Sequence, residues 1–163
     1  MVKIAINESN VQKQQNAYVK DWLWRYRKAK LEVRRLEGEY EELVSIQESA
    51  GAVNYDGMPH GSESPDLSSL IIMRDSSLSK IIKARRKMAD TLAEIIRAID
   101  MLEDVERDII SLRYVQLVDG FGIRSMEEIA DSIKYTSRYV QKIHGVALQK
   151  LYSIIPQITK EVY

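Results

Sequence analysis

The stretch RSMEEIADSIKYTSRYVQKIHGVALQKL, residues 124–151, decides the fold because it encodes two helices separated by a short turn. Ser125 and Glu128 match the S-x-x-E capping box, in which each side chain satisfies a free backbone N–H of the other residue. Thr136 can cap the second helix after a turn at Lys134 and Tyr135. A short helix, a tight turn and a longer helix are typical of the helix-turn-helix motif.

Apolar residues at helical spacing predict the buried side of each helix. In the first helix they are Met126, Ile129, Ala130 and Ile133, and in the second they are Val140, Ile143, Ala147, Leu148 and Leu151. Pro156 is predicted to mark the end of the second helix.

A third helix is expected before these two, over residues 104–114. Its Val105, Ile109 and Leu112 fall on one face, and the chain then breaks in the segment VDGFG, where Gly120 and Gly122 permit a turn. Residues 104–151 are therefore predicted to form a small three-helix unit.

The second helix of a helix-turn-helix places its N-terminal residues in the major groove of DNA. The residues there that point away from the apolar face are Ser137, Arg138, Tyr139, Gln141 and Lys142. Arg138 can donate two hydrogen bonds to guanine, Gln141 can pair with adenine, and Lys142 can contact phosphate or guanine. Tyr139 can contact a phosphate or a thymine methyl group. Each residue alone is more often an ordinary surface side chain, but their shared position predicts DNA binding.

Two long apolar stripes in the front two-thirds of the chain predict two long helices. The first stripe has steps of 3 or 4 residues and consists of Tyr18, Trp22, Tyr26, Ala29, Val33, Leu36, Tyr40 and Leu43. The second follows Asp66 and consists of Leu67, Ile71, Leu78, Ile81, Met88, Leu92, Ile95, Ile99 and Leu102. Such stripes bury each other by packing antiparallel, or by pairing with the stripes of a second chain.

Residues 49–65, SAGAVNYDGMPHGSESP, separate the two stripes and contain three glycines and two prolines, so we expect a loop. Its segment Asn54–Ser62 has no role that follows from its residues. The predicted organisation is an all-α fold: a long antiparallel, coiled-coil-like hairpin over residues 1–100, then a helix-turn-helix domain over residues 101–163. Arg74 and Arg85 fall on or near the second stripe, which leaves apolar surface for a homodimer.

The charges cancel over the whole chain but are segregated along it. Residues 13–35 carry eight Lys or Arg and two acids, residues 37–66 carry eight acids and no base, and residues 74–97 carry seven bases and three acids. A DNA-binding surface must therefore be local. We interpret the basic runs of the hairpin as solvated faces with acidic partners one turn away, such as Arg35 with Glu39.

The residue content argues against an enzyme or a metal protein. The chain has no cysteine, and neither His60 nor His144 has a second ligand at metal spacing. Neighbouring acids such as Glu127 and Glu128 are expected to be solvated, and no phosphate-binding glycine loop is present. We therefore expect no catalytic residue, no metal and no cofactor. The N-terminus lacks the pattern of a signal peptide, and no apolar window is long enough for a membrane span, so we expect a soluble protein.

About 50 residues of the chain resemble region 4 of bacterial sigma factors. The motifs are ERDIISLRY (residues 106–114), SMEEIADSI (125–133), YTSRYVQKIH (135–144) and ALQKL (147–151), in the family's order. The resemblance implies that promoter DNA is contacted by Thr136, Ser137, Arg138, Tyr139, Gln141 and Lys142. Ser137 and Arg138 stand where housekeeping sigma factors usually have arginine followed by glutamate, which implies a target other than the usual promoter hexamer. No stretch resembles region 2, which argues against a complete sigma factor.

A region 4 behind a long charged hairpin, with the loop NYDGMPHGS (54–62), is similar to the ArpU/RinA-like late-gene regulators of phages and prophages. That resemblance implies a transcriptional regulator in the cytoplasm of a bacterial host cell, with double-stranded DNA and host RNA polymerase as partners. Two alternatives stay open. One is a small terminase subunit that binds packaging-site DNA as a ring, and the other is a helix-turn-helix that serves only protein interactions.

Overall fold

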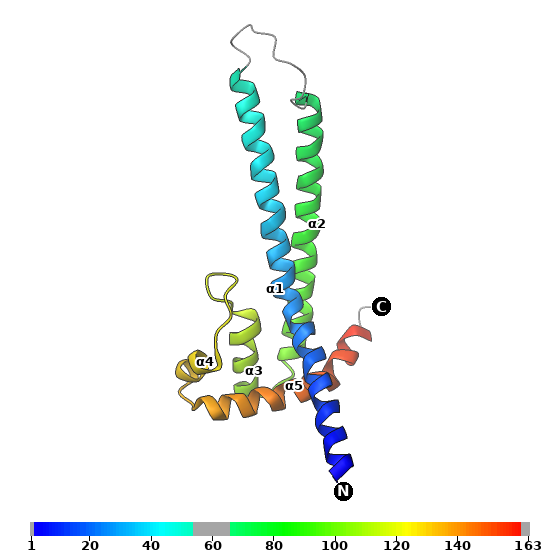
Figure 1. Ribbon diagram of the computed structural model, residues 1–163, viewed down its shortest axis with the longest axis vertical. Helices are drawn as coiled ribbons and strands as arrows, with labels where there is room; N and C mark the ends of the chain where they lie inside the picture. Colours follow the sequence, from blue (N-terminus) through cyan, green and yellow to red (C-terminus); the bar gives the residue numbers. More distant parts are fainter. Residues whose placement is uncertain (1, 54–65, 161–163) are drawn as a thin grey trace. The chain divides into compact units, whose positions relative to one another are not determined.

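The computed structural model describes residues 2–53 and 66–160, and most of these residues are helical (Figure 1). The helices are α1 (Val2–Val53), α2 (Leu67–Ile99), α3 (Asp104–Ile110), the π-helical turn η1 (Ser111–Val115), α4 (Met126–Ile133) and α5 (Ser137–Lys160). The predicted all-α fold, with two long helices ahead of a helix-turn-helix, is confirmed.

The first long helix extends beyond both ends of the stripe that predicted it. It begins at Val2 rather than near Tyr18, and it ends at Val53, past the expected start of the loop at residue 49. Residues 49–53 contain alanine and valine but no proline, and one glycine costs a helix only about 1 kcal/mol, so the last turn persists. The rest of the expected loop, with Asn54–Ser62, lies outside the described residues.

The chain divides into two compact units. The first, here called the split unit, comprises residues 1–28 and 89–163, and the second, the hairpin unit, comprises residues 29–88. Each long helix contributes one part to each unit. We expected a boundary near residue 100 between a hairpin domain and a helix-turn-helix domain. Neither compact unit begins or ends there. The division into these two domains stays a prediction.

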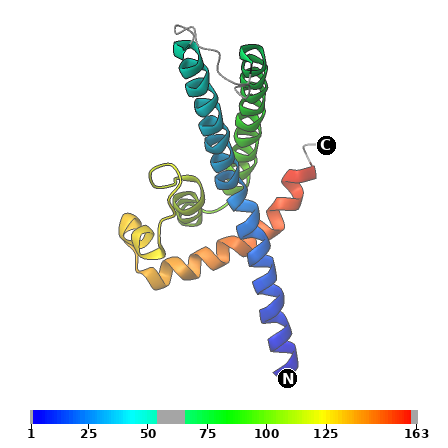
Figure 2. The same ribbon diagram turned by 45° about the horizontal axis from the view of Figure 1, so that its top comes forward.

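In the hairpin unit, the second half of α1 and the first half of α2 run antiparallel (Figures 1 and 2). Val33 and Leu36 of α1 are buried there, as are Leu70 and Ile81 of α2. Polar contacts cross the same seam. Arg85 Nε donates to Glu37 Oε1 at 3.0 Å, and Arg74 donates to Gln47 Oε1 at 3.3 Å.

The row of α2 that faces α1 in this unit differs from the predicted stripe. The covered or half-covered positions are Leu70, Arg74, Ser77, Ile81, Ala84 and Met88, at steps of 4, 3, 4, 3 and 4 residues. Leu67, Ile71 and Leu78, which the prediction placed in the seam, are 53%, 38% and 38% exposed. The reason is that α2 carries two neighbouring apolar rows, and a single partner helix covers only one of them.

The core of the split unit draws on every helix. Its fully or almost fully buried apolar residues are Val19, Trp22, Leu23, Tyr26, Ile95, Ala98, Ile99, Leu102, Ile109, Ile110, Tyr114, Ile129, Ala130, Val140, Ala147, Leu148, Leu151, Ile155 and Ile158. Tyr18, predicted to face inward, is instead 52% exposed, and Val19 and Leu23 take the buried positions on α1.

Pro156 lies inside α5 and does not end it, contrary to the prediction. Proline cannot donate a backbone hydrogen bond to the carbonyl four residues earlier, so it kinks a helix or ends it. Figure 1 shows α5 changing direction toward its C-terminal end. Ile155 and Ile158 are 1% and 5% exposed, and burial of these side chains holds the last turns in helical form.

None of the described helices has a stretch both long enough and apolar enough to cross a membrane.

Candidate nucleic-acid interface

The turn between α4 and α5 forms as its local signals predict. Ser125 Oγ accepts a hydrogen bond from the backbone N–H of Glu128 at 3.2 Å, and the Glu128 carboxylate accepts one from the backbone N–H of Ser125 at 2.6 Å. Thr136 Oγ1 accepts from the backbone N–H of Tyr139 at 3.3 Å. The predicted capping box and the predicted cap of the second helix are confirmed.

Lys134 makes the sharp bend between the two helices. Its φ of 62° and ψ of 38° place it in the left-handed region, and its backbone N–H donates to Ala130. Tyr135 N donates to the same carbonyl at 3.0 Å. Non-glycine residues rarely adopt this conformation, but a helix C-terminus commonly requires it.

A small apolar cluster holds α3, α4 and α5 together. Its buried members are Ile109, Ile129, Ala130 and Val140, and Val105, Leu112, Met126, Ile133 and Ile143 pack against them half-buried. The small side chain of Ala130, 2% exposed, lies where α4 meets α5. The inward faces predicted for these three helices are therefore confirmed.

The structure divides the six predicted DNA-contacting residues into two groups. Arg138, Gln141 and Lys142 are exposed on the face of α5 opposite the buried Val140, so they form one outward row at the N-terminal end of the helix. Gly145 continues this face one turn further, and a Cβ built there would meet no atom within 4 Å. We call Arg138, Gln141, Lys142 and Gly145 the outward row.

The other three predicted residues make contacts within the protein. Thr136 caps α5, and Ser137 Oγ lies 3.4 Å from Glu127 Oε1. Tyr139 stacks on Tyr135, with ring centroids 4.9 Å apart and planes 25° apart. It also projects about 160° away from Gln141 around the helix, because successive residues turn by about 100°.

Glu127 places a negative charge next to the start of α5. Hydrogen bonds from its own backbone N–H and from Ser125 hold the pKa of this exposed carboxyl below its usual range. Glu127 therefore stays ionised at neutral pH. A carboxylate at a helix N-terminus stabilises the helix. Its negative charge also offsets part of the positive charge at the start of α5, so Arg138 and Lys142 supply the positive charge of this surface.

The ALQKL motif ties α5 to the start of α3. Ala147, Leu148 and Leu151 are buried, while Lys150 Nζ lies 2.6 Å from Glu106 Oε1 and 3.0 Å from Glu103 Oε1. Glu106 is only 4% exposed, and Lys150 is the partner of its buried carboxylate. The hydrogen bonds that Lys150 donates to the Glu106 and Glu103 carboxylates raise the pKa of Lys150.

A buried polar pair lies behind the outward row. Tyr114 Oη and His144 Nε2 are 3.0 Å apart, and their rings stack with centroids at 5.9 Å and planes 10° apart. Burial, then the positive charges of Lys20 and Arg113, lowers the pKa of His144 to about 4. Burial raises the pKa of Tyr114 to about 12. His144 is thus a neutral core residue at physiological pH, although it lies on the helix that carries the outward row.

The N-terminal part of α1 packs against this domain, and the apolar stripe of α1 did not predict these contacts. Trp24 packs on Tyr114 with ring centroids 4.5 Å apart, and Arg27 Nε donates to the Phe121 carbonyl at 2.8 Å. Gln149 of α5 donates to Asn16. The run Trp22, Leu23 and Trp24 is a sequence signal for such packing. Three consecutive large apolar residues point to different sides of a helix, so one partner helix cannot cover all of them.

The connection between η1 and α4 is a tight turn. Val118 N donates to the Gly122 carbonyl at 2.9 Å, and Asp119 and Gly120 have φ of 48° and 83°. A Cβ at Gly122 would lie 3.0 Å from the Val118 oxygen and 3.1 Å from its Cβ. The two predicted glycines are therefore needed at these positions. Arg113 also donates to the Arg124 carbonyl, which fixes the end of the turn.

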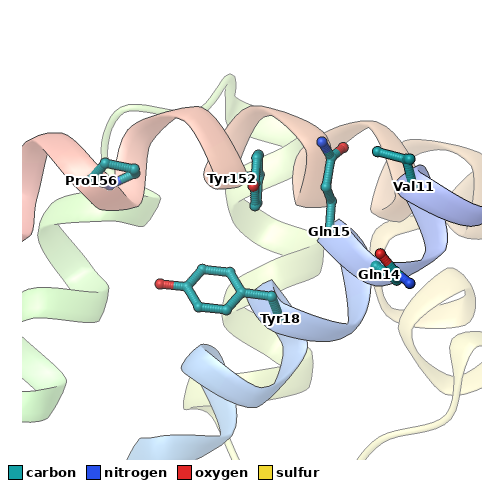
Figure 3. A pocket seen from close by; sticks show the side chains of 6 residues that line it. All are labelled: Val11, Gln14, Gln15, Tyr18, Tyr152 and Pro156. Atoms are coloured by element: carbon teal, nitrogen blue, oxygen red, sulfur yellow. The ribbon is translucent and has the colours of Figure 1, made fainter. Parts of the chain in front are cut away.

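A shallow pocket lies between α1 and α5 within the split unit (Figure 3). Val11, Gln14, Gln15, Tyr18, Tyr152 and Pro156 line it. The Tyr18 and Tyr152 rings meet edge to face, with centroids 6.0 Å apart. The lining contains amides, phenols and apolar groups but no carboxylate or basic group. In the described part of the chain, no group of three or more His, Cys, Asp or Glu could hold a metal ion.

Comparison with known protein families agrees with this geometry. Residues 98–153 match the family model described as sigma-70, region 4. The chain therefore contains a sigma-70 region 4 domain. The match begins at the end of α2 and ends inside α5, so it includes α3, η1, α4, the turn and the outward row. A domain of this type is a DNA-binding helix-turn-helix and not a catalytic domain. Searches of curated proteins and of solved structures found no match to the chain.

Proposed function

We propose that this protein is a sequence-specific DNA-binding transcriptional regulator whose α5 inserts its N-terminal end into the major groove. The observation that carries the proposal is the outward row on the second helix of a sigma-70 region 4 domain. Arg138 and Gln141 have the donors and acceptors that distinguish base edges, and Lys142 supplies charge for phosphate or guanine. Thr136, Ser137 and Tyr139 contribute mainly by fixing the start of α5, although each retains atoms that can reach a phosphate.

The shape of α4 and α5 supports this assignment. The capped α4, the left-handed bend at Lys134 and the small Ala130 let the two helices cross closely. In such a motif the first helix crosses the DNA backbone and the second reads the bases. The core side of α5 is fully occupied by Val140, Ala147 and Leu148, so only the opposite face is left for the base edges.

Selection of bound sequences from random double-stranded DNA tests the proposal. The full chain is expected to enrich one motif, and Arg138→Ala to weaken binding to it by about 1 to 3 kcal/mol and to relax one base position. Arg97→Ala, an exposed arginine in the last turn of α2, serves as the matched control and is expected to leave the motif unchanged. Enrichment of no motif, or the same motif and affinity for Arg138→Ala, contradicts the assignment.

We further propose that the regulated genes are late genes of a phage or prophage and that host RNA polymerase is a second partner. The support is the resemblance of the chain to ArpU/RinA-like regulators, together with a region 4 domain, which in sigma factors works next to polymerase. Transcription from a late-gene promoter by purified bacterial polymerase, with and without the protein, measures both claims. A change in transcript level together with a shift of the polymerase–promoter complex in a gel is the expected result. If the protein binds the promoter while transcript level and complex are unchanged, the polymerase claim fails.

A further inference from the structure

The hairpin unit has an exposed apolar groove on α2, on the side that α1 leaves uncovered. Asp75, Leu78, Ser79, Ile82, Lys83 and Arg86 line it. Ile82 is 64% exposed and Leu78 is 38% exposed, although both are large apolar side chains. Ile71 and Leu67, at 38% and 53% exposure, extend the same row toward the start of α2. Contiguous apolar surface of this kind marks a site that another surface covers.

The charges of the groove are unequal at its two ends. Asp75 lies at one end, and Lys83 and Arg86 lie at or near the other. Asp75 has only a long contact, 3.9 Å, to the neighbouring Arg74. Among the described residues, Lys83 and Arg86 form no ion pair within the chain. The groove therefore presents one acid and two bases that have no strong partner of their own.

The spacing of the residues that line the groove is the same when α2 is read in either direction. Positions 75, 79, 82 and 86 follow at steps of 4, 3 and 4 residues, which places them on one face of α2 over about 16 Å. Reading this face backwards exchanges Asp75 with Arg86 and Ser79 with Ile82. A copy of α2 laid antiparallel in the groove thus brings Asp75 of each chain to Arg86 of the other, at both ends. The apolar side chains of Leu78 and Ile82 then meet in the middle.

We propose that this groove is the interface of an isologous homodimer in which the α2 helices of two chains pack antiparallel. A twofold axis passes between residues 80 and 81 of both chains. Two Asp75–Arg86 ion pairs determine that the two α2 helices are antiparallel. Burial of Leu78 and Ile82 stabilises the dimer. A parallel pair would place Asp75 against Asp75 and Arg86 against Arg86, so the charges select the antiparallel arrangement. The second copy is favoured over an unrelated peptide because the groove is complementary to itself.

Solution mass over a range of concentrations tests the dimer. Sedimentation equilibrium of the full chain is expected to give twice the mass of one chain at high concentration. Ile82→Glu is expected to give a monomer, and because Ile82 is exposed the variant should keep its helical circular dichroism. Met73→Glu is the matched control: Met73 is also exposed, at 49%, but lies nine residues earlier on the opposite face of α2. A wild-type monomer at every concentration, a ring of many chains, or a dimer that survives Ile82→Glu overturns the proposal.

Disulfide cross-linking tests the direction, because the natural chain has no cysteine. A mixture of Asp75→Cys chains and Arg86→Cys chains is expected to form a cross-linked heterodimer under mild oxidation, while either chain alone does not. In the mixed dimer the other Asp75–Arg86 pair is retained. Cross-linking of Asp75→Cys chains to each other indicates a parallel pair and overturns the antiparallel arrangement. This test does not depend on DNA binding, so its result is independent of the proposed function.

Discussion

Tyr114 and His144 share a hydrogen bond of 3.0 Å inside the split unit, and the hydrogen-bonded imidazole lies on α5, on the side away from Arg138 and Lys142. This buried contact therefore helps to hold the helix that carries the outward row against η1. At neutral pH the imidazole is uncharged, and it can serve as the acceptor of the Tyr114 hydroxyl.

Acid is expected to destabilise the protein through His144. Its pKa is lowered from 6.5 to about 4, so the folded chain resists a proton that the unfolded chain accepts. The stability contribution is complete above pH 6.5 and is lost as the pH falls from 6.5 to about 4, by about 3 kcal/mol in total. Urea unfolding at a series of pH values measures this loss.

The matched control for this prediction is the chain's other histidine. His144→Gln, which cannot take up a proton, is expected to flatten the dependence between pH 6.5 and 4. His60→Gln is expected to leave it as in the wild type. An equal acid slope in His144→Gln and in the wild type would show that the buried pair is not its cause.

Gly145→Ala is expected to stabilise the protein and weaken DNA binding. The added Cβ meets nothing within 4 Å, and alanine favours a helix over glycine by about 1 kcal/mol. The same methyl group extends from the outward row, where DNA is proposed to approach. Thermal unfolding measures the gain in stability, and titration with the selected DNA measures the loss of DNA affinity. Gly38→Ala in α1, which also has open space, is the control, with a similar gain and unchanged DNA affinity. Tighter or equal binding by Gly145→Ala contradicts the proposed face.

Gly122→Ala is expected to act in the opposite direction. A methyl group there would lie 3.0 Å from a backbone oxygen, so the turn must shift, at a cost of about 1 to 3 kcal/mol. Thermal unfolding of Gly122→Ala and Gly145→Ala side by side measures the contrast. If both variants are stabilised, the tight turn at Val118 does not form as described.

Lys150→Met is expected to destabilise the protein because it leaves the buried Glu106 carboxylate without its closest partner. Glu106→Leu in the same chain is expected to restore much of the lost stability, since the pair is then replaced by apolar groups. The midpoint of urea unfolding for both single variants and the double variant measures their coupling. Strictly additive effects would mean that the 2.6 Å contact contributes no coupling.

Local signals predicted the parts of the fold that neighbouring residues determine. Ser125, Glu128 and Thr136 lie within three residues of the groups they cap, so the start of α4 and of α5 could be placed from sequence. The buried side of α5 followed from its period. In α2 the same period did not show which of two rows is buried, the row of Leu70 and Ile81 or the row of Ile71 and Leu78. Both rows are apolar, and the position of α1 determines which of them is covered.

The periodicity of apolar residues did not predict contacts between segments that are distant in the sequence. Asn16 and Gln149, or Trp24 and Tyr114, are hydrogen-bonded or packed only because the fold brings their helices together. The continuation of α5 through Pro156 likewise depends on the burial of Ile155 and Ile158, which outweighs one lost backbone hydrogen bond. Arg138, Gln141 and Lys142 were predicted to point away from the core, but the contacts of Ser137 with Glu127 and of Tyr139 with Tyr135 required the structure.

The contact between Asn16 and Gln149 spans 133 positions of sequence. On the ribosome, at about 5 to 20 residues per second, roughly 7 to 27 s separate the synthesis of the two partners. The hairpin unit has all of its residues once residue 88 is made, whereas Trp22, Leu23 and Trp24 stay uncovered until the later helices of the split unit are made. A nascent chain stalled before η1, which carries Tyr114, should therefore recruit chaperones at its N-terminal segment, and completion of the chain should end that association.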